Sequence, residues 1–189
     1  HRGGVGSDVN CGDGAGILIQ LPHKFMQKVC KEQNICLPKY TEYAVGMLFC
    51  SNDENIKQKS IDKLREIVLK HNQIFLGLRT VPINPSIIGE QAKNIMPCIL
   101  QVFIEKQKEI DLLTFERKLY LILKQSEEEI TKDFDSKFYF SSLSSKTIVY
   151  KGMLTTNQLE QFYLDLQDKD IETAIAMVHS RFSTNTFPS

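Results

Sequence analysis

The sequence predicts a layered domain that mixes helices and strands, of α/β or α+β class. Apolar runs of strand length recur along the chain, as at 43–50 and 98–104. Other segments carry apolar residues at every third or fourth position, which is the period of an amphipathic helix. The two kinds of segment follow one another in mixed order without an internal repeat, as expected for sheets covered by helices.

The chain opens on a glycine-rich stretch, with six of its ten glycines in the first sixteen residues. So much permissive backbone predicts tight turns or the close approach of a ligand. The apolar run 17–21 then predicts a buried strand. Pro22 suits the first turn of a helix, whose apolar stripe is formed by Phe25, Met26, Val29 and Cys30.

The middle of the chain predicts a strand at 43–50 that is buried on both faces. Ser51 and Glu54 have the spacing of a capping box and predict a helix that continues towards His71. An extended segment broken by two prolines follows at 77–85, and a second buried strand at 98–104.

In the second half, Asp111 opens a helix with apolar residues at spacings of three and four. The acidic run 127–129 comes after it and predicts a solvated face. Two strands, 138–140 and 147–150, are expected on either side of a loop at 141–146. The helix after them is capped by Thr155 with Gln158. The last expected strand covers 173–178.

Composition limits the function. The chain has 189 residues, of which 42% are hydrophobic, and this suffices for a core. Its 23 basic residues balance 23 acidic ones, which argues against nucleic acid and against a polybasic membrane face. No apolar run reaches the ~18 residues that a membrane span needs. The first residue is His1 rather than Met, and the chain stops at Ser189 without a break signal, so we expect an internal fragment.

The cysteines and histidines predict neither a disulfide scaffold nor a metal site. Five cysteines are present, an odd number without a close CxxC pair, and this favours a reducing intracellular compartment. Cys30, Cys50 and Cys98 lie in apolar segments and are expected to be small buried hydrophobes. The four histidines are scattered and form no pair with ligand spacing.

Two polar clusters interrupt the apolar pattern. The first is the glycine-rich start, with Arg2 and Asp13; its glycine spacing does not match a phosphate-binding loop, and a plain turn is the alternative. The second is the segment 180–185, where Arg181 stands among hydroxyl and amide side chains after a strand. The planar fork of arginine pairs bidentately with a carboxylate. The second cluster therefore suggests a carboxylate site, with a surface turn and an ordinary ion pair as the alternative.

At these clusters the sequence resembles the large chain of the glutamate synthase family. The matching blocks occur in the order of that family and extend over the whole chain. The most specific of them is the last, His179-Ser180-Arg181-Phe182-Ser183-Thr184-Asn185-Thr186-Phe187-Pro188-Ser189. The others are residues 1–3, 11–18, 22–25, 43–47, 115–117 and 141–154.

The resemblance implies that residues 1–189 are part of a class II glutamine amidotransferase domain. The implied fold is α+β, the four-layer αββα sandwich of the N-terminal-nucleophile hydrolases, incomplete at both ends. The implied enzyme hydrolyses L-glutamine to glutamate and ammonia, and the ammonia is channelled to 2-oxoglutarate. Its partners would be the synthase domains of the same chain and a reductase subunit or domain.

The same resemblance implies no cofactor in this segment, with FMN and an iron–sulfur cluster in other domains of the full enzyme. A cytoplasmic location is expected, with a plastid as the alternative.

The resemblance also implies roles for individual residues. Arg181 matches the arginine that pairs with the α-carboxylate of glutamine. Thr184 and Asn185 match the pocket wall, with Phe182 as a packing partner. Arg2 matches an arginine that orients groups near the nucleophile, whereas Asp13 and its neighbouring glycines are expected to be structural.

The resemblance places the central catalytic groups outside these residues. The nucleophilic cysteine, whose α-amine is the base, should precede His1, so Cys11 is not that residue. The Asn-Gly pair of the oxyanion hole should follow Ser189. The fragment alone is therefore expected to be inactive, because losing oxyanion donors by itself costs ~10²–10³ in rate.

Two other functions stay open at this stage. One is a non-catalytic module that keeps the fold for assembly or regulation. The other is a different class II amidotransferase, such as a purine or amino-sugar enzyme, although blocks 12–18 and 142–154 count against it.

Overall fold

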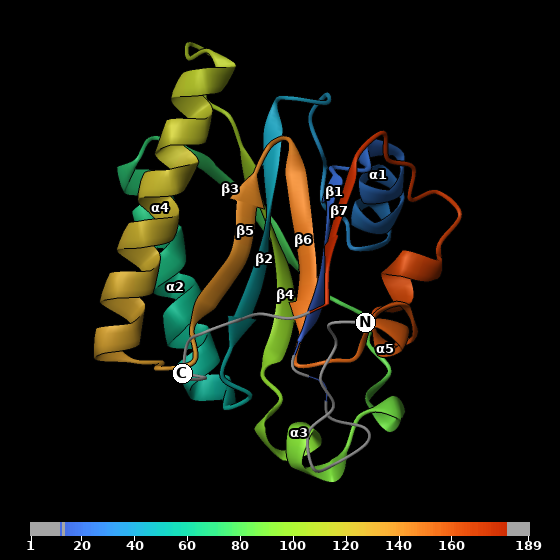
Figure 1. Cartoon of the computed structure of the whole chain (residues 1–189). Coiled ribbons are helices and arrows are strands. Elements are labelled where there is room, and N and C mark those ends of the chain that lie inside the picture. Colours follow the sequence, from blue (N-terminus) through green and yellow to red (C-terminus); the bar gives the residue numbers. More distant parts are fainter. Residues whose placement is uncertain (1–11, 13, 181–189) are drawn as a thin grey trace.

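The computed structural model describes residue 12 and residues 14–180, which form two antiparallel sheets and the helices around them (Figure 1). The predicted mixture of helices and strands is thus confirmed. The strands are β1 (Ala15–Gln20), β2 (Tyr43–Cys50), β3 (Ile74–Thr80), β4 (Cys98–Glu105), β5 (Tyr139–Ser144), β6 (Thr147–Gly152) and β7 (Ala176–His179). The α-helices are α1 (His23–Glu32), α2 (Glu54–Lys70), α3 (Glu90–Ile95), α4 (Leu112–Asp133) and α5 (Thr156–Phe162), with 3₁₀ helices η1 (Pro85–Ile87) and η2 (Leu164–Gln167).

The larger sheet has the order β3-β4-β2-β5 and the smaller one the order β6-β1-β7 among the described residues. Figure 1 shows α2 and α4 side by side against the larger sheet, and α1 and α5 on the side of the smaller sheet. The two sheets lie between these helices, so the central strands of the larger sheet have no solvated face. This explains why 43–50 and 98–104 are almost continuously apolar.

Alternation along β2 and β4 divides the interior into two cores. On β2, Tyr43, Val45 and Met47 belong to a core shared with β1, β6 and α1. The intervening Ala44 and Leu48 belong to a second core, shared with α2 and α4. Successive strand residues point to opposite faces, so one strand contributes to both cores. The predicted stripe of α1 is confirmed, because its four residues are the buried ones of that helix.

The hairpin β5–β6 passes from one sheet to the other. β5 pairs with β2 in the larger sheet, whereas β6 pairs with β1 in the smaller one. Serine side chains bridge this change of sheet: the Ser141 hydroxyl donates to the Val149 carbonyl at 2.9 Å, and the Val149 amide donates to the Ser142 hydroxyl at 3.0 Å. The predicted loop at 141–146 is therefore wrong in its extent, since residues 141–144 are strand and only 145–146 turn.

Glu116 on α4 holds the turn of this hairpin. Its carboxylate accepts from the Ser145 amide at 2.8 Å and from the Ser145 hydroxyl at 2.5 Å, and also from the Ser144 hydroxyl at 3.1 Å. Two blocks that carry the family resemblance, 115–117 and 141–154, thus meet in space. Their contact is structural, because the carboxylate satisfies the polar groups of a tight turn.

A buried ionic network joins the two sheets. Arg79 on β3 donates to both carboxylate oxygens of Asp165 on η2, at 2.7 and 2.8 Å, and to the side chain of Gln101 on β4 at 2.8 Å. The Tyr150 hydroxyl on β6 donates to Asp165 at 3.1 Å. The guanidinium also lies over the Phe25 ring of α1 at 5.6 Å.

Burial sets the electrostatics of this network. All four polar residues are at least nine-tenths buried. Burial opposes the charge on Arg79, but the hydrogen bonds and charge of Asp165 outweigh it, and its pKa is raised. Burial and then the Asp165 charge raise the pKa of Tyr150 well above its usual value. Arginine therefore stays charged and tyrosine protonated, as the network requires.

Several local predictions differ from the structure. The first residue before α2 is Asp53, whose carboxylate accepts from the Asn55 and Ile56 amides, so the predicted capping box of Ser51 and Glu54 is wrong. Asp53 competes better because its oxygen reaches two free amides at once. The box of Thr155 with Gln158 is confirmed.

Further differences concern element boundaries. The acidic run 127–129 lies within α4, not after it, and Glu127 accepts from the Phe140 amide at 3.1 Å rather than facing water alone. β3 begins at Ile74 and ends before the two prolines, and α3 had no prediction. β7 covers Ala176–His179 rather than 173–178. None of the helices in the described ranges combines the length and apolarity needed to cross a bilayer.

We predict that Asp165→Asn lowers the free energy of unfolding by about 3–5 kcal/mol, because it leaves the guanidinium of Arg79 buried without its counter-charge. Chemical denaturation with the midpoint and slope both fitted measures this loss.

The matched control is Glu54→Gln, which removes the exposed ion pair with Lys57 (2.6 Å) and should cost at most about 1 kcal/mol. Replacing Arg79 by Met together with Asp165 by Leu should cost less than Asp165→Asn alone. Equal losses for Asp165→Asn and the control would contradict a structural role for the network.

Candidate functional site

The two polar clusters of the sequence flank paired strands. The first cluster runs into β1 and the second leaves β7, and these strands are antiparallel neighbours. The start of β1 and the end of β7 therefore lie at the same end of the sheet. In register, Gly16 lies opposite His179 on one side and opposite Lys151 of β6 on the other.

The predicted site residues themselves lie outside the described residues. These are Arg2, Arg181, Phe182, Thr184 and Asn185, as well as Cys11 and Asp13 of the first cluster. The structure does describe the strand next to each cluster, β1 after the first and β7 before the second. The described ends, Gly14 before β1 and Ser180 after β7, belong to the same edge of the smaller sheet.

Two glycines at this edge allow other groups to approach closely. A Cβ on Gly16 would lie 2.3 Å from the His179 ring and 2.8 Å from Cβ of Lys151, so these side chains occupy the space beside the glycine. A Cβ on Gly12 would lie 2.3 Å from the carbonyl carbon of Leu154, which is backbone. Gly14 has a φ of 118°, which other residues rarely adopt. The local structure therefore explains why each of these three positions is a glycine, as expected.

Two basic side chains, Lys151 and His179, stand at this edge. The ammonium of Lys151 lies over the Tyr139 ring at 4.4 Å from its centre and also contacts the Tyr139 hydroxyl. Burial, and then the positive charge of Lys151, lower the pKa of His179. At neutral pH the edge thus carries an ammonium and a neutral imidazole, next to the point where the second cluster leaves the sheet.

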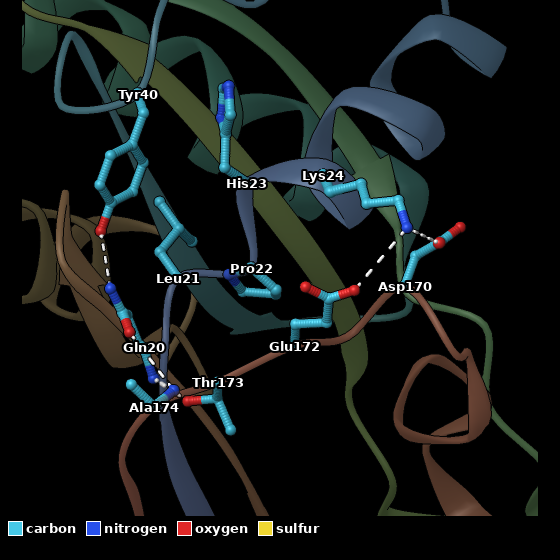
Figure 2. A pocket seen from close by; sticks show the side chains of 10 residues that line it. All are labelled: Gln20, Leu21, Pro22, His23, Lys24, Tyr40, Asp170, Glu172, Thr173 and Ala174. Carbon is cyan, nitrogen blue, oxygen red and sulfur yellow. Dashed lines mark hydrogen bonds and ion pairs between the residues drawn. The ribbon is translucent and has the colours of Figure 1, made fainter.

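A broad hollow of the described chain lies elsewhere. It has a volume of about 630 Å³ and lies where β1 ends and α1 begins, at the opposite end of β1 from the glycines. Figure 2 shows its polar side chains turned to one another: Lys24 pairs with Asp170 at 2.7 Å, and the Gln20 amide donates to the Tyr40 hydroxyl at 3.3 Å. Burial lowers the pKa of His23, which hydrogen-bonds Tyr43. These pairs hold the surface together, and no reactive group converges there.

The described cysteines do not supply a metal site or a nucleophile for the edge of the smaller sheet at Gly16 and His179. Within the described ranges, no three side chains of His, Cys, Asp or Glu gather closely enough to ligate a metal ion. Cys30 is buried and its pKa is raised to about 12, so its thiol stays protonated. The expectation of buried thiols is right for Cys30 and Cys50, while Cys98 is partly exposed.

Sequence reasoning missed the polar groups that fix the relation of the two sheets. Arg79, Gln101 and Asp165 were not singled out, although Gln101 stands in the middle of an apolar strand. A polar side chain at a core-facing strand position signals a buried hydrogen-bonding partner. Nothing in the sequence indicates that Asp165 is the counter-charge of Arg79, because it lies 86 positions further along the chain.

Comparison with known proteins supplies the remaining information. The family described as "Glutamine amidotransferases class-II" matches residues 1–189. The chain is 50% identical to the "Glutamate synthase [NADPH] large chain" of Bacillus subtilis and 40% identical to the "Ferredoxin-dependent glutamate synthase 1, chloroplastic/mitochondrial" of Arabidopsis thaliana. It is 41% identical to the "Glutamate synthase [NADH]" of Saccharomyces cerevisiae. All of this chain is covered in each case, but only 12%, 12% and 9% of those relatives.

We predict that Gly12→Ala lowers the free energy of unfolding by about 1–3 kcal/mol, because the new methyl group would overlap backbone atoms of Leu154 and Thr155. Thermal unfolding measures the loss. Gly152→Ala is the matched control: its Cβ would meet only the Leu154 side chain, at 3.2 Å, and a smaller loss is expected. If Gly12→Ala were as stable as the original chain, the glycine would have to be explained by a ligand instead.

Proposed function

The chain belongs to the family of class-II glutamine amidotransferases, and from this premise we propose that it forms part of the glutaminase domain of a glutamate synthase. The domain would hydrolyse L-glutamine to glutamate and ammonia, and the ammonia would pass through the protein to 2-oxoglutarate. The observation that carries the proposal is the match of the whole chain, at 40–50% identity, to proteins named as glutamate synthases. Residues 1–189 would then form a part of one domain, in a four-layer sandwich that further residues complete.

The antiparallel pairing of β1 with β7 supports the placement of the substrate. It brings the flanks of the two clusters to one edge, where Lys151 adds positive charge. We assign Arg181 to the α-carboxylate of glutamine, since its planar fork binds a carboxylate through two parallel hydrogen bonds. Thr184 and Asn185 would line the pocket, and Phe182 would pack against its wall.

Arg2 is assigned an orienting role beside the nucleophile. The attacking thiol, activated by its own α-amine, would belong to a cysteine that precedes His1 in the longer protein. The oxyanion donors would come from an Asn-Gly pair that follows Ser189. Residues 1–189 alone would then bind part of the substrate and release no ammonia from it.

The wider assignments follow from the relatives. They name NADPH, NADH or ferredoxin as the reductant of those proteins, so a reductase subunit or domain and the synthase domains are the proposed partners. FMN and an iron–sulfur cluster are assigned to other domains of the longer protein, on the family resemblance alone. The proposed compartment is the cytoplasm, or a plastid as in the chloroplastic relatives. No observation favours a non-catalytic module, or a purine or amino-sugar enzyme.

In the full-length protein we predict that Arg181→Ala raises the KM for glutamine by roughly 10–100-fold, because a charged hydrogen-bonding partner of the carboxylate is lost. Arg181→Lys should keep the charge and lose the fork, with an intermediate KM. Ammonia release at varied glutamine concentration gives both constants. Arg117→Ala on the exposed face of α4 is the matched control, and KM should not change. A KM unaffected by Arg181→Ala would remove this residue from the pocket.

Arg2→Lys should lower kcat more than it raises KM, because an orienting residue acts on the reacting groups and not on substrate affinity. The same ammonia assay resolves the two constants. A rise in KM alone would instead place Arg2 on the substrate. The absence of any glutamine-dependent ammonia from the unmodified full-length protein would support the non-catalytic module.

A further inference from the structure

Cys50 and Cys98 lie directly opposite each other on neighbouring strands. Cys50 ends β2, Cys98 begins β4, and the antiparallel register pairs the two residues. Opposite residues of an antiparallel pair point to the same face of the sheet. Here it is the face covered by α2, because Cys50 belongs to the core that α2 and α4 share, and Cys98 packs against that core.

The two thiols are unequal. Cys50 is fully buried, whereas Cys98 is partly exposed. The neighbouring Cys50 thiol, and then the charge of Lys57, lower the pKa of Cys98 to about 7. The neighbouring Cys98 sulfur, and then burial, raise the pKa of Cys50. A thiol that ionises near neutral pH thus stands beside one that stays protonated.

The strand geometry already meets the requirement of a disulfide. Opposite Cα atoms of an antiparallel pair are about 4.5–5.5 Å apart. A disulfide needs Cα atoms about 4.4–6.8 Å apart, so the bond can form without separating the strands. The exposed Cys36 lies outside the strands, beyond the end of α1.

We propose that Cys50 and Cys98 are a paired redox site that a hydroperoxide converts to an intramolecular disulfide. The Cys98 thiolate attacks the peroxide oxygen, the O–O bond breaks, and Cys98 becomes a sulfenic acid while hydroxide leaves. The Cys50 sulfur then attacks the Cys98 sulfur, an S–S bond forms, and the sulfenic oxygen leaves as water with the Cys50 proton. The peroxide is reduced by two electrons, and the two thiols are oxidised by the same two. A dithiol reductant reverses the modification.

The disulfide would fasten one end of the larger sheet. Next to the pair, the Asn52 amide already donates to the Met96 carbonyl at 2.6 Å, which links the residues after β2 to those before β4. Closing the 50–98 loop covalently restricts the unfolded chain. Oxidation should therefore slow the opening of this sheet end, seen as slower amide hydrogen exchange at the β2 and β4 ends.

The test uses the full-length protein under native conditions. The reduced protein is treated with a small molar excess of hydrogen peroxide, free thiols are then blocked, and the digest is mapped by mass spectrometry. The expected result is a cross-linked pair of peptides containing Cys50 and Cys98, lighter by two hydrogens and separated by a dithiol reductant. The free thiols of both residues should disappear together, while Cys36 remains alkylated.

Variants separate the two roles. Cys50→Ala should leave a sulfenic acid on Cys98 that a cyclic dione reagent traps, and Cys98→Ser should abolish the cross-link and leave Cys50 reduced. Cys36→Ser is the matched control, and the cross-link should form as before. Two outcomes in the unmodified protein would overturn the proposal: Cys98 still reduced after Cys36 is oxidised, or Cys98 oxidised to sulfinic acid without any bond to Cys50. Neither outcome depends on whether the variants fold.

Discussion

The relative position of the two sheets depends on the buried ion pair between Arg79 and Asp165. Both charges are removed from water, and each is stabilised mainly by the other and by Gln101 and Tyr150. The four groups come from β3, η2, β4 and β6, so the network can form only when both sheets and the segment after α5 are in place. Apolar side chains fill the rest of the core but tolerate small displacements. The network does not, because its hydrogen bonds are directional.

The sequence predicted elements better than it predicted their connections. Strands β2 and β4 followed from continuous apolar runs of strand length, and the buried stripe of α1 followed from the helical period of its apolar residues. The predicted cap of α2 was wrong. Ser51 and Asp53 both suit the role of a cap, and only the path of the backbone before the helix decides between them. The passage of β5 and β6 into different sheets left no local signal. Their sequence is that of a hairpin within a single sheet. Only the pairing of β6 with β1 and of β5 with β2 places the two strands in different sheets.

The candidate site was predicted by residue type but not by position. Arg2 and Arg181 are far apart in the sequence, and no periodicity relates them. Both lie outside the described residues, and what the fold provides is the register of Gly16 with His179, which brings the flanks of the two clusters together. The glycines contribute indirectly: at Gly12 and Gly16 the absence of a side chain lets neighbouring strands and loops come together. Glycines that suggest a ligand-binding loop can thus serve chiefly to allow the close packing of the structure beside that loop.

The topology also determines how long each strand waits for its pairing partners during synthesis of the chain. β1 leaves the ribosome well before both of its partners, because β6 and β7 are encoded more than a hundred residues later. At usual rates of translation the apolar strand waits roughly ten seconds before either edge can be paired. The larger sheet lacks only β5 once β4 has emerged, and can begin to form during that interval. Chaperones that shield short apolar segments near the ribosome would therefore matter more for β1 than for any other strand described here.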